Sequence, residues 1–227
     1  MTFDKEGFAR IASVIDTACC DAVAAAFDEP LAEPRCAGVR HLIDHPGVRS
    51  LLQHSTLAKV VCDVLGDSAF AYKATLFDKH TEANWLVAWH QDISIPVQQK
   101  LALHGWTGWS RKEEVLYAQP PTEILSRLLA LRINLDDCDD DNGPLRLLVG
   151  SHRLGRLKQS GIATCVDRHH EQTITGPRGS GLLMRPLLIH ASSKAASQAR
   201  RRVLHMEFAN FALPVGMDWY RQVRMVR

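Results

Sequence analysis

The chain has 227 residues, of which 46% are hydrophobic and 23% are charged. This composition is ordinary for a globular protein and excludes global disorder and low complexity. With 27 basic against 25 acidic residues, the formal net charge is only +2, which gives no reason to expect a nucleic-acid or membrane-surface partner. The length suits a single domain that spans the whole chain.

The six cysteines form no CxxC pair, so they signal neither a zinc ribbon nor a redox motif. Cysteines without a pairing motif are typical of proteins in a reducing compartment, and we expect a cytoplasmic protein. The first residues are charged and amphipathic, without the basic and then apolar order of a signal peptide. No run approaches the length of about 18 uninterrupted apolar residues, so no membrane span is expected.

The N-terminal part of the chain, about residues 1–67, is predicted to be helical. Residues 5–27 carry apolar side chains mostly at three- and four-residue steps, which predicts an amphipathic helix. A second helical stretch is predicted to begin at Pro46, which suits a first helical position, and to end at Gly66, which suits a C-terminal cap.

From about residue 68 to 210 the pattern changes to aromatic and β-branched residues in rough alternation, which predicts short strands. The predicted strands span residues 69–77, 85–95, 128–135, 145–149, 181–188 and 203–208. Helices followed by several short strands predict an α+β chain with a β-sandwich or barrel core. Two segments, 97–121 and 155–179, are predicted to be long loops, which in compact domains are often lids or binding loops. Trp106 and Trp109 in the first loop could either cover a substrate or anchor the loop.

His90 and Asp92 are the central observation in this part of the chain. On a strand, residues two apart point to the same face, so an imidazole nitrogen and a carboxylate oxygen can converge on one point. With a second histidine from another strand they would supply three ligands on one face of an octahedron, which is the arrangement of non-haem Fe(II) oxygenases. The pair alone is weak evidence, because a structural ion pair has the same spacing.

His190 is the strongest candidate for the third ligand. It ends the apolar run 181–189, as expected for a core strand that delivers a side chain to a site. Arg201 follows eleven residues later, and its guanidinium could bind the distal carboxylate of a dicarboxylic co-substrate. Alternation along the strand places Arg200 and Arg202 on the opposite face from Arg201.

Together these motifs resemble the phytanoyl-CoA dioxygenase family. The matching segments are Trp89-His90-Gln91-Asp92, Asp141-Asn142-Gly143-Pro144-Leu145 with Gly150-Ser151-His152, and His190-Ala191-Ser192 with Arg201. The resemblance covers about residues 68–210, and the N-terminal helices fit more loosely. Two positions depart from the family pattern, because Val149 stands where a proline is usual and Ala195 where an asparagine is usual.

The resemblance implies a double-stranded β-helix and an Fe(II)- and 2-oxoglutarate-dependent dioxygenase that consumes O2. It implies iron ligands at His90, Asp92 and His190, 2-oxoglutarate anchored by Arg201, and Gln91 and Ser192 close to the co-substrate. The expected reaction is hydroxylation of an unactivated carbon with release of succinate and CO2, and the same oxidative chemistry can end in desaturation or cyclisation. Asp92 argues against halogenation, because related halogenases have a small residue there.

The expected substrate is a small metabolite or a secondary-metabolism intermediate, since 227 residues leave modest room for a large substrate beyond the core. Two other function classes stay open. A metal-binding jelly-roll enzyme, such as an isomerase, that does not use 2-oxoglutarate would keep its activity in Arg201→Ala. A non-catalytic binding module would show no oxygen uptake. The sequence leaves the oligomeric state open.

Other polar residues carry weaker predictions. The acidic run 136–142 is expected to be a solvated turn, because a calcium loop starting there would need glutamate where Leu147 stands. Lys73 could reach the pocket, but an exposed strand lysine is the default expectation. Arg132 and Asn134 share one face of their strand, and the sequence leaves open whether this face lines a cavity.

Overall fold

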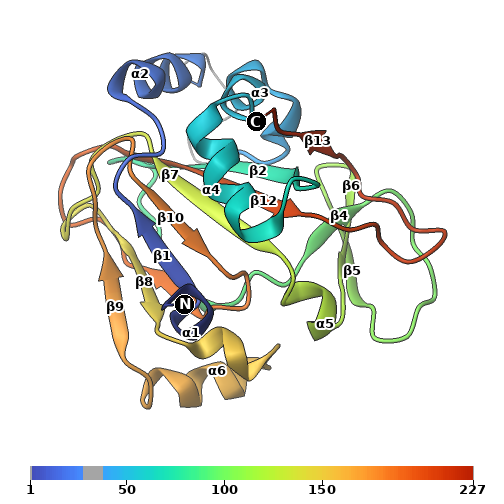
Figure 1. The fold of residues 1–227 in the computed structure, drawn as a ribbon. Coiled ribbons are helices and arrows are strands. Elements are labelled where there is room, and N and C mark those ends of the chain that lie inside the picture. Colours follow the sequence, from blue (N-terminus) through green and yellow to red (C-terminus); the bar gives the residue numbers. More distant parts are fainter. Residues whose placement is uncertain (1, 28–37, 227) are drawn as a thin grey trace.

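A computed structural model describes residues 2–27 and 38–226 of the chain (Figure 1). The helices are α1 (Thr2–Glu6), α2 (Thr17–Ala26), α3 (Pro46–Leu51), α4 (Ser55–Leu65), α5 (Thr122–Leu125) and α6 (Gln159–Val166), with 3-10 turns η1 (Leu42–Asp44) and η2 (Ser151–Leu154). The strands are β1 (Phe8–Ile11), β2 (Phe70–Lys79), β3 (Val87–His90), β4 (Ile95–Val97), β5 (Thr107–Lys112), β6 (Val115–Gln119), β7 (Leu129–Asn134), β8 (Leu145–Leu148), β9 (Glu171–Ile174), β10 (Gly181–Met184), β11 (His190–Ser192), β12 (Arg201–Ala209) and β13 (Val223–Arg224). Within the described ranges, every helix is too short or too polar to cross a membrane.

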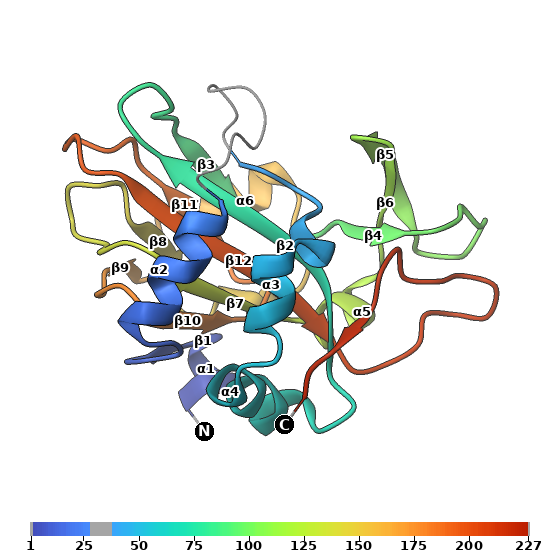
Figure 2. The same cartoon turned by 90° about the horizontal axis from the view of Figure 1, so that it is seen from above.

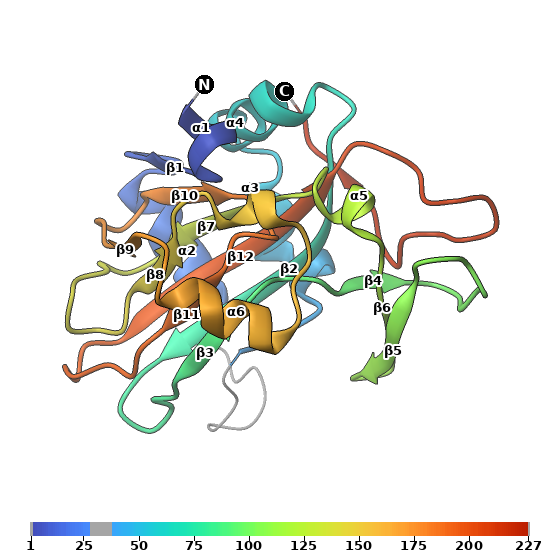
Figure 3. The same ribbon diagram turned by 90° about the horizontal axis from the view of Figure 1, so that it is seen from below.

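Two antiparallel sheets face each other and enclose the interior. The larger sheet has the strand order β1-β10-β7-β12-β2-β13, and the smaller one has the order β3-β11-β8-β9. Helices α2, α3 and α4 lie against the outer face of the larger sheet (Figure 2), and α6 lies against the outer face of the smaller sheet (Figure 3). This arrangement is a double-stranded β-helix, and it confirms the predicted α+β fold with flanking N-terminal helices.

The central strands of the larger sheet are buried on both faces, and the two faces differ in chemistry. On β12, Leu204, Met206 and Phe208 face the helices and join the main apolar core. His205 and Glu207, which alternate with them, face the smaller sheet and are also buried. Because side chains alternate along a strand, the helices cover an apolar outer face while a polar face is enclosed between the sheets.

The two segments that were predicted to be loops are largely folded. In the first, β5 and β6 pair with β4 into a third sheet beside the other two (Figure 1), and in the second α6 and β9 form. The loop prediction failed at β5 because most of its residues are exposed and show no apolar alternation. Trp106 is buried in an apolar cluster, and its ring stacks on Trp109 at a centroid distance of 6.4 Å, so this pair anchors the segment.

The single helix predicted at 5–27 is wrong. Gly7 has a φ of 85° and ends α1, after which β1 pairs with β10 at the edge of the larger sheet. The side chain of Asp16 then caps α2 by accepting a hydrogen bond from the N–H of Cys19 at 2.7 Å. The apolar residues in this stretch are spaced as in a helix, but residues 8–11 form a strand. They do so because the edge of β10 needs a partner for its backbone hydrogen bonds, and β1 provides it.

The second helical stretch is two helices, α3 and α4. Pro46 opens α3 and Gly66 caps α4 with a φ of 83°, as predicted. Between them the N–H groups of Gln53 and His54 donate to the carbonyls of Ser50 and Leu51, and these shorter three-residue bonds tighten and end α3.

Two predicted strands are shorter than expected, and both end next to the space between the two sheets. The stretch 85–95 divides into β3 and β4, with irregular backbone at 91–94. The stretch 181–188 ends at Met184, because residues 185–189 form a turn in which the N–H of Leu188 donates to the carbonyl of Arg185 at 3.0 Å. This turn passes the chain from the larger sheet to the smaller one, where β11 begins.

Candidate functional site

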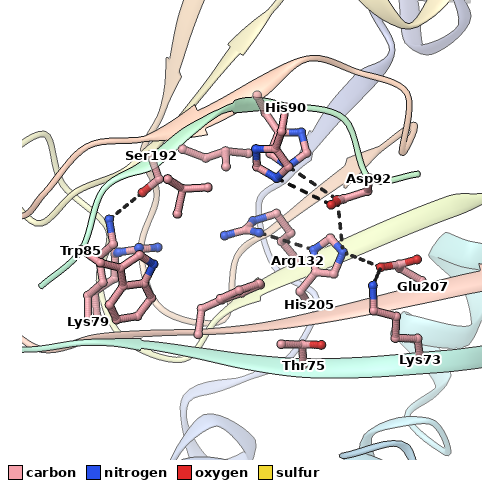
Figure 4. A pocket seen from close by; sticks show the side chains of 15 residues that line it. Lys73, Thr75, Lys79, Trp85, His90, Asp92, Arg132, Ser192, His205 and Glu207 are labelled. Carbon is pink, nitrogen blue, oxygen red and sulfur yellow. Dashed lines mark hydrogen bonds and ion pairs between the residues drawn. The ribbon is translucent and has the colours of Figure 1, made fainter. Parts of the chain in front are cut away.

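A pocket lies between the two sheets (Figure 4). It has about 570 Å³ of space, part of which is open to solvent. The larger sheet lines it with alternate residues of neighbouring strands: Lys73, Thr75, Phe77 and Lys79 from β2, Arg132 from β7, and Arg201, His205 and Glu207 from β12. The smaller sheet and the segments beside it complete the lining, so residues far apart in the sequence share one cavity.

His90, Asp92 and His190 meet at one wall of this pocket. His90 ends β3 and faces His190, which begins β11, as a cross-strand pair whose ring centroids are 4.2 Å apart. The Oδ1 atom of Asp92 lies 3.7 Å from His90 Nε2, and its Oδ2 atom lies 3.5 Å from His190 Nε2. The potential ligand atoms of the three residues all lie within 4.8 Å of one another, so one metal ion could bind all three.

Backbone carbonyls orient both imidazoles. His90 Nδ1 lies 2.8 Å from the carbonyl oxygen of Ala88, and His190 Nδ1 lies 2.8 Å from that of Leu188. Because a carbonyl oxygen only accepts, each Nδ1 carries the proton and each Nε2 keeps its lone pair. Burial and the neighbouring His90 lower the pKa of His190 to about 3, so this ring is neutral at physiological pH, as a metal ligand must be.

A second cluster of buried polar residues adjoins these three. His205 Nε2 lies 3.8 Å from Asp92 Oδ2 and 3.3 Å from Glu207 Oε1. Glu207 also accepts hydrogen bonds from Lys73 Nζ and from the hydroxyl of Tyr72, each at 2.6 Å. Burial would raise the pKa of Glu207, but the Lys73 ammonium lowers it below its ordinary value, so this pair is ionised. Lys73, which was expected to be exposed, is therefore a pocket residue whose charge is neutralised internally.

The opposite end of the pocket is cationic. Arg201 is buried, and its Nε donates to the carbonyl of Asn142 at 3.1 Å. Lys79, the cross-strand neighbour of Arg201, donates to the hydroxyl of Ser192 at 2.8 Å and to the carbonyl of Ser193. In the described part of the chain, no carboxylate forms an ion pair with Lys79 or Arg201. This end of the pocket therefore suits an anion.

The acidic turn between β7 and β8 supports this cationic end with its backbone. The carbonyls of Asn142 and Gly143 accept hydrogen bonds from Arg201 Nε and Ser192 Oγ. Gly143 has a φ of 75°, and a Cβ at this position would lie 2.7 Å from a backbone oxygen and 3.0 Å from Lys79 Nζ. Only glycine lets the turn approach the pocket this closely.

The residues present fit an iron ion and a dicarboxylate. Two imidazoles and one carboxylate are the donor set of non-haem iron enzymes, and they leave coordination positions for other ligands. The cationic end lies in the same pocket, so an anion bound there could also reach the metal position.

A known protein family matches this chain over most of its length. The family described as Phytanoyl-CoA dioxygenase (PhyH) matches residues 3–203, which include the three candidate ligands and Arg201. The chain belongs to the phytanoyl-CoA dioxygenase family. Members of this family are 2-oxoglutarate-dependent non-haem iron oxygenases, as the resemblance in the sequence had implied.

Relatives of this family member include enzymes with small substrates. The L-proline trans-4-hydroxylase of Streptomyces griseoviridis is 26% identical over 182 residues, which are 68% of this chain and 59% of that relative. EctD from S. alaskensis, solved with 2-oxoglutarate and 5-hydroxyectoine, has a TM-score of 0.70 at 18% identity, with 92% of this chain and 73% of that chain covered. The carbocyclase SnoK from nogalamycin biosynthesis has a TM-score of 0.67 at 16% identity, with 91% and 81% covered. At these identities the two structural likenesses show the fold.

The structure does not bring Gln91 into the pocket of this family member. Its Nε2 donates to the carbonyls of Gly155 and Leu187 at 2.8 and 2.7 Å, and its Oε1 accepts from the N–H of Leu157 at 2.9 Å. Alternation along the chain turns it away from His90 and Asp92. Gln91 therefore ties a neighbouring loop to the turn before β11, and its side-chain amide is occupied by these backbone contacts.

Arg200 and Arg202 point away from the pocket, as alternation predicted. Arg200 pairs with Asp78 at 2.7 Å, and Arg202 pairs with Asp136 at 2.8 Å. Of these three consecutive arginines, Arg201 is the one that lines the pocket.

Sequence reasoning missed several pocket residues on the larger sheet. Lys79, His205 and Glu207 were not singled out, and the orientation of Arg132 was left open. A signal was present, because alternate positions of β2 and of β12 are polar, with a single apolar interruption on each strand, Phe77 and Val203. Such a face on an otherwise apolar strand indicates an enclosed polar surface.

Proposed function

We propose that this chain is an Fe(II)- and 2-oxoglutarate-dependent dioxygenase that hydroxylates an unactivated carbon of a small metabolite. In this proposal His90, Asp92 and His190 are the iron ligands, and Arg201 and Ser192 hold the co-substrate. The observation that supports it most is that two imidazoles, one carboxylate and a cationic end share a single pocket.

Iron bound by these ligands would supply dioxygen activation coupled to oxidation of 2-oxoglutarate to succinate and CO2. The protein side chains would position the reactants. Arg201 would bind the distal carboxylate of 2-oxoglutarate in bidentate fashion, with Lys79 and Ser192 beside it. The rings of Phe77 and Trp85 also line the pocket and would reduce the access of water to this end.

The size of the pocket and the relatives both favour a small substrate. Without the space that is open to solvent, the cavity volume is about 100 Å³, which is below the usual range for small-molecule sites and leaves no room for a large substrate. The relative from Streptomyces griseoviridis is named for hydroxylation of L-proline, which supports hydroxylation as the main outcome here. SnoK is a carbocyclase, so ring closure is the alternative outcome that product analysis would reveal.

The proposal can be tested with purified protein, Fe(II) and 2-oxoglutarate. We expect about one iron per chain and formation of succinate, which a panel of small metabolites should stimulate. His190→Ala should lower both iron affinity and succinate formation by about 100-fold or more, since losing even an outer hydrogen-bond partner of a ligand costs 10- to 100-fold. His170→Ala, at an exposed histidine, should leave both unchanged.

Two results would argue against the proposal. If His190→Ala bound iron and formed succinate like the wild type, the ligand assignment would be wrong. If the iron-loaded wild type consumed oxygen equally well without 2-oxoglutarate, a metal-dependent enzyme that does not use this co-substrate would be favoured.

A further inference from the structure

Arg132 is the pocket residue whose charge the proposed function leaves unexplained. It lies on β7, in the interior face of the larger sheet, and its side chain is 9% exposed. Its NH1 atom lies 3.4 Å from His205 Nδ1, and its guanidinium lies 5.4 Å from the centroid of the Phe77 ring. A guanidinium has five N–H donors, and this one long contact uses at most one of them in a side chain that lines the pocket.

Arg132 adjoins the cationic end, so this side of the pocket brings together three positive charges: Lys79, Arg132 and Arg201. In the described part of the chain, none of the three forms an ion pair with a carboxylate, whereas Arg200 and Arg202 on the outer face both do. Burial and the nearby Arg201 lower the pKa of Arg132 to about 10, and burial and both arginines lower the pKa of Lys79 to about 8. The three groups repel one another in a partly desolvated space, so this arrangement of charges is electrostatically unfavourable in the absence of an anion.

Arg132 lies between the two parts of the site. On one side it contacts His205, whose Nε2 is 3.8 Å from Asp92 Oδ2. On the other side lie Lys79 and Ser192 (Figure 4), with Arg201 opposite Lys79 across the β2–β12 pair. A dicarboxylate that reaches from the metal position to Arg201 would pass alongside Arg132.

We propose that Arg132 is a second guanidinium for the co-substrate, and that with it the pocket binds dicarboxylates even without a metal ion. The choice of a dicarboxylate rests on the proposed function. The reason for metal independence is electrostatic, because three cations attract an anion whether or not a metal is bound at the other end. Succinate should bind as well, since it shares the two carboxylates of 2-oxoglutarate.

The proposal is tested by calorimetric titration of succinate and 2-oxoglutarate into the full chain after the metal has been removed with a chelator. We expect both to bind the wild type, and the monocarboxylate butyrate to bind much more weakly. Arg132→Met should weaken succinate binding by roughly 10- to 100-fold, which is the usual effect of losing hydrogen bonds to a charged group. Arg49→Met removes the same charge from an exposed position on α3 and should bind succinate like the wild type.

Thermal unfolding separates this role from a merely structural one. Without ligand, Arg132→Met should unfold at a higher temperature than the wild type, because it removes repulsion from Arg201 and Lys79. Succinate should raise the midpoint of the wild type and of Arg49→Met, and raise that of Arg132→Met far less. Arg132→Gln, which keeps a polar side chain without the charge, should behave in the same way if Arg132→Met folds poorly.

The proposal is overturned if succinate does not bind the metal-free wild type, or if Arg132→Met and Arg132→Gln bind it as tightly as the wild type. It is also overturned if both variants are less stable without ligand and equally responsive to succinate. Succinate binding that depends on Arg132 supports it even if the iron-loaded protein never oxidises 2-oxoglutarate, a result that would count against the proposed function alone.

Discussion

The two ends of the pocket use the same pair of strands in opposite ways. At one end Lys73 on β2 faces Glu207 on β12, and at the other Lys79 on β2 faces Arg201 on β12. The first pair has opposite charges at 2.6 Å, while the second brings two like charges together. Opposite charges across neighbouring strands stabilise a sheet, and like charges destabilise it.

This difference distinguishes a structural charge pair from a binding site. The Lys73–Glu207 pair is complete within the protein, because Tyr72 donates to Oε2 of Glu207 and His205 Nε2 lies 3.3 Å from Oε1, the oxygen that Lys73 binds. In the part of the chain that the structure describes, the Lys79–Arg201 end has no carboxylate partner, so a bound anion would supply its counter-charge. A protein keeps such an unfavourable arrangement when function requires it. The end with unneutralised charges is therefore the expected binding site, and the end with neutralised charges is expected to stabilise the fold.

Removing one partner of the neutralised pair should have the largest effect. Lys73→Met leaves Glu207 buried without a counter-charge, which should lower the free energy of unfolding by about 3–5 kcal/mol, measured by urea denaturation. Lys59→Met removes an exposed lysine that pairs with Asp63 on α4 and should cost less than about 1 kcal/mol. Equal losses in the two variants would show that the Lys73–Glu207 pair is not a structural unit.

The pH dependence of stability should reveal the repulsion at the other end. Lys79 loses its proton near pH 8 in the folded state but keeps it to about 10.5 when unfolded, so the unfolded chain binds more protons between these values. The free energy of unfolding should therefore rise with pH in this window, by up to about 3 kcal/mol at about 1.4 kcal/mol per pKa unit. In Lys79→Met this part of the rise should be missing. Parallel curves for the two proteins would mean that Lys79 is not held in a repulsive site.

A smaller effect is expected from alanine substitutions at two glycines with positive φ, which distinguish backbone strain from a change in the cationic end of the pocket. Gly143→Ala and Gly66→Ala both place a side chain at positive φ, which costs about 1–3 kcal/mol of stability in each. A Cβ at Gly66 would contact nothing within 4 Å, whereas one at Gly143 would press on Lys79 Nζ at 3.0 Å. Succinate binding should weaken in Gly143→Ala and stay normal in Gly66→Ala. The same affinity in both would exclude a role for the turn in shaping the pocket.

Much of this arrangement could be predicted from local sequence patterns. The spacing of His90 and Asp92 predicted that the two converge, although Asp92 lies in irregular backbone beyond the end of β3. The apolar run before His190 indicated a strand that ends at a site, but the chain turns at 185–189 and His190 begins β11. Alternation separated Arg201 from its neighbours. This separation of the arginines depended on the two-residue period of a strand, which holds wherever the strand lies in the fold.

The errors arose where the outcome depended on contacts between distant segments. The helix predicted at 5–27 gave way to β1 because β10 offers a free edge, and nothing near residue 8 reveals that edge. Polar strand β5 was missed because its partner β6, and not its own pattern, defines it. Lys73 was expected to be exposed because the position of Glu207 opposite it could not be known.

By itself the sequence determined which side chains share a strand face: Arg201 apart from Arg200 and Arg202, and Arg132 with Asn134. Only the tertiary structure decided which of these faces look into the pocket and which charges are neutralised there. The physical reason is that a strand between helices and a second sheet is buried on both sides, so its own pattern cannot say which side is the interior. Packing of the helices on one face and of the smaller sheet on the other makes that choice.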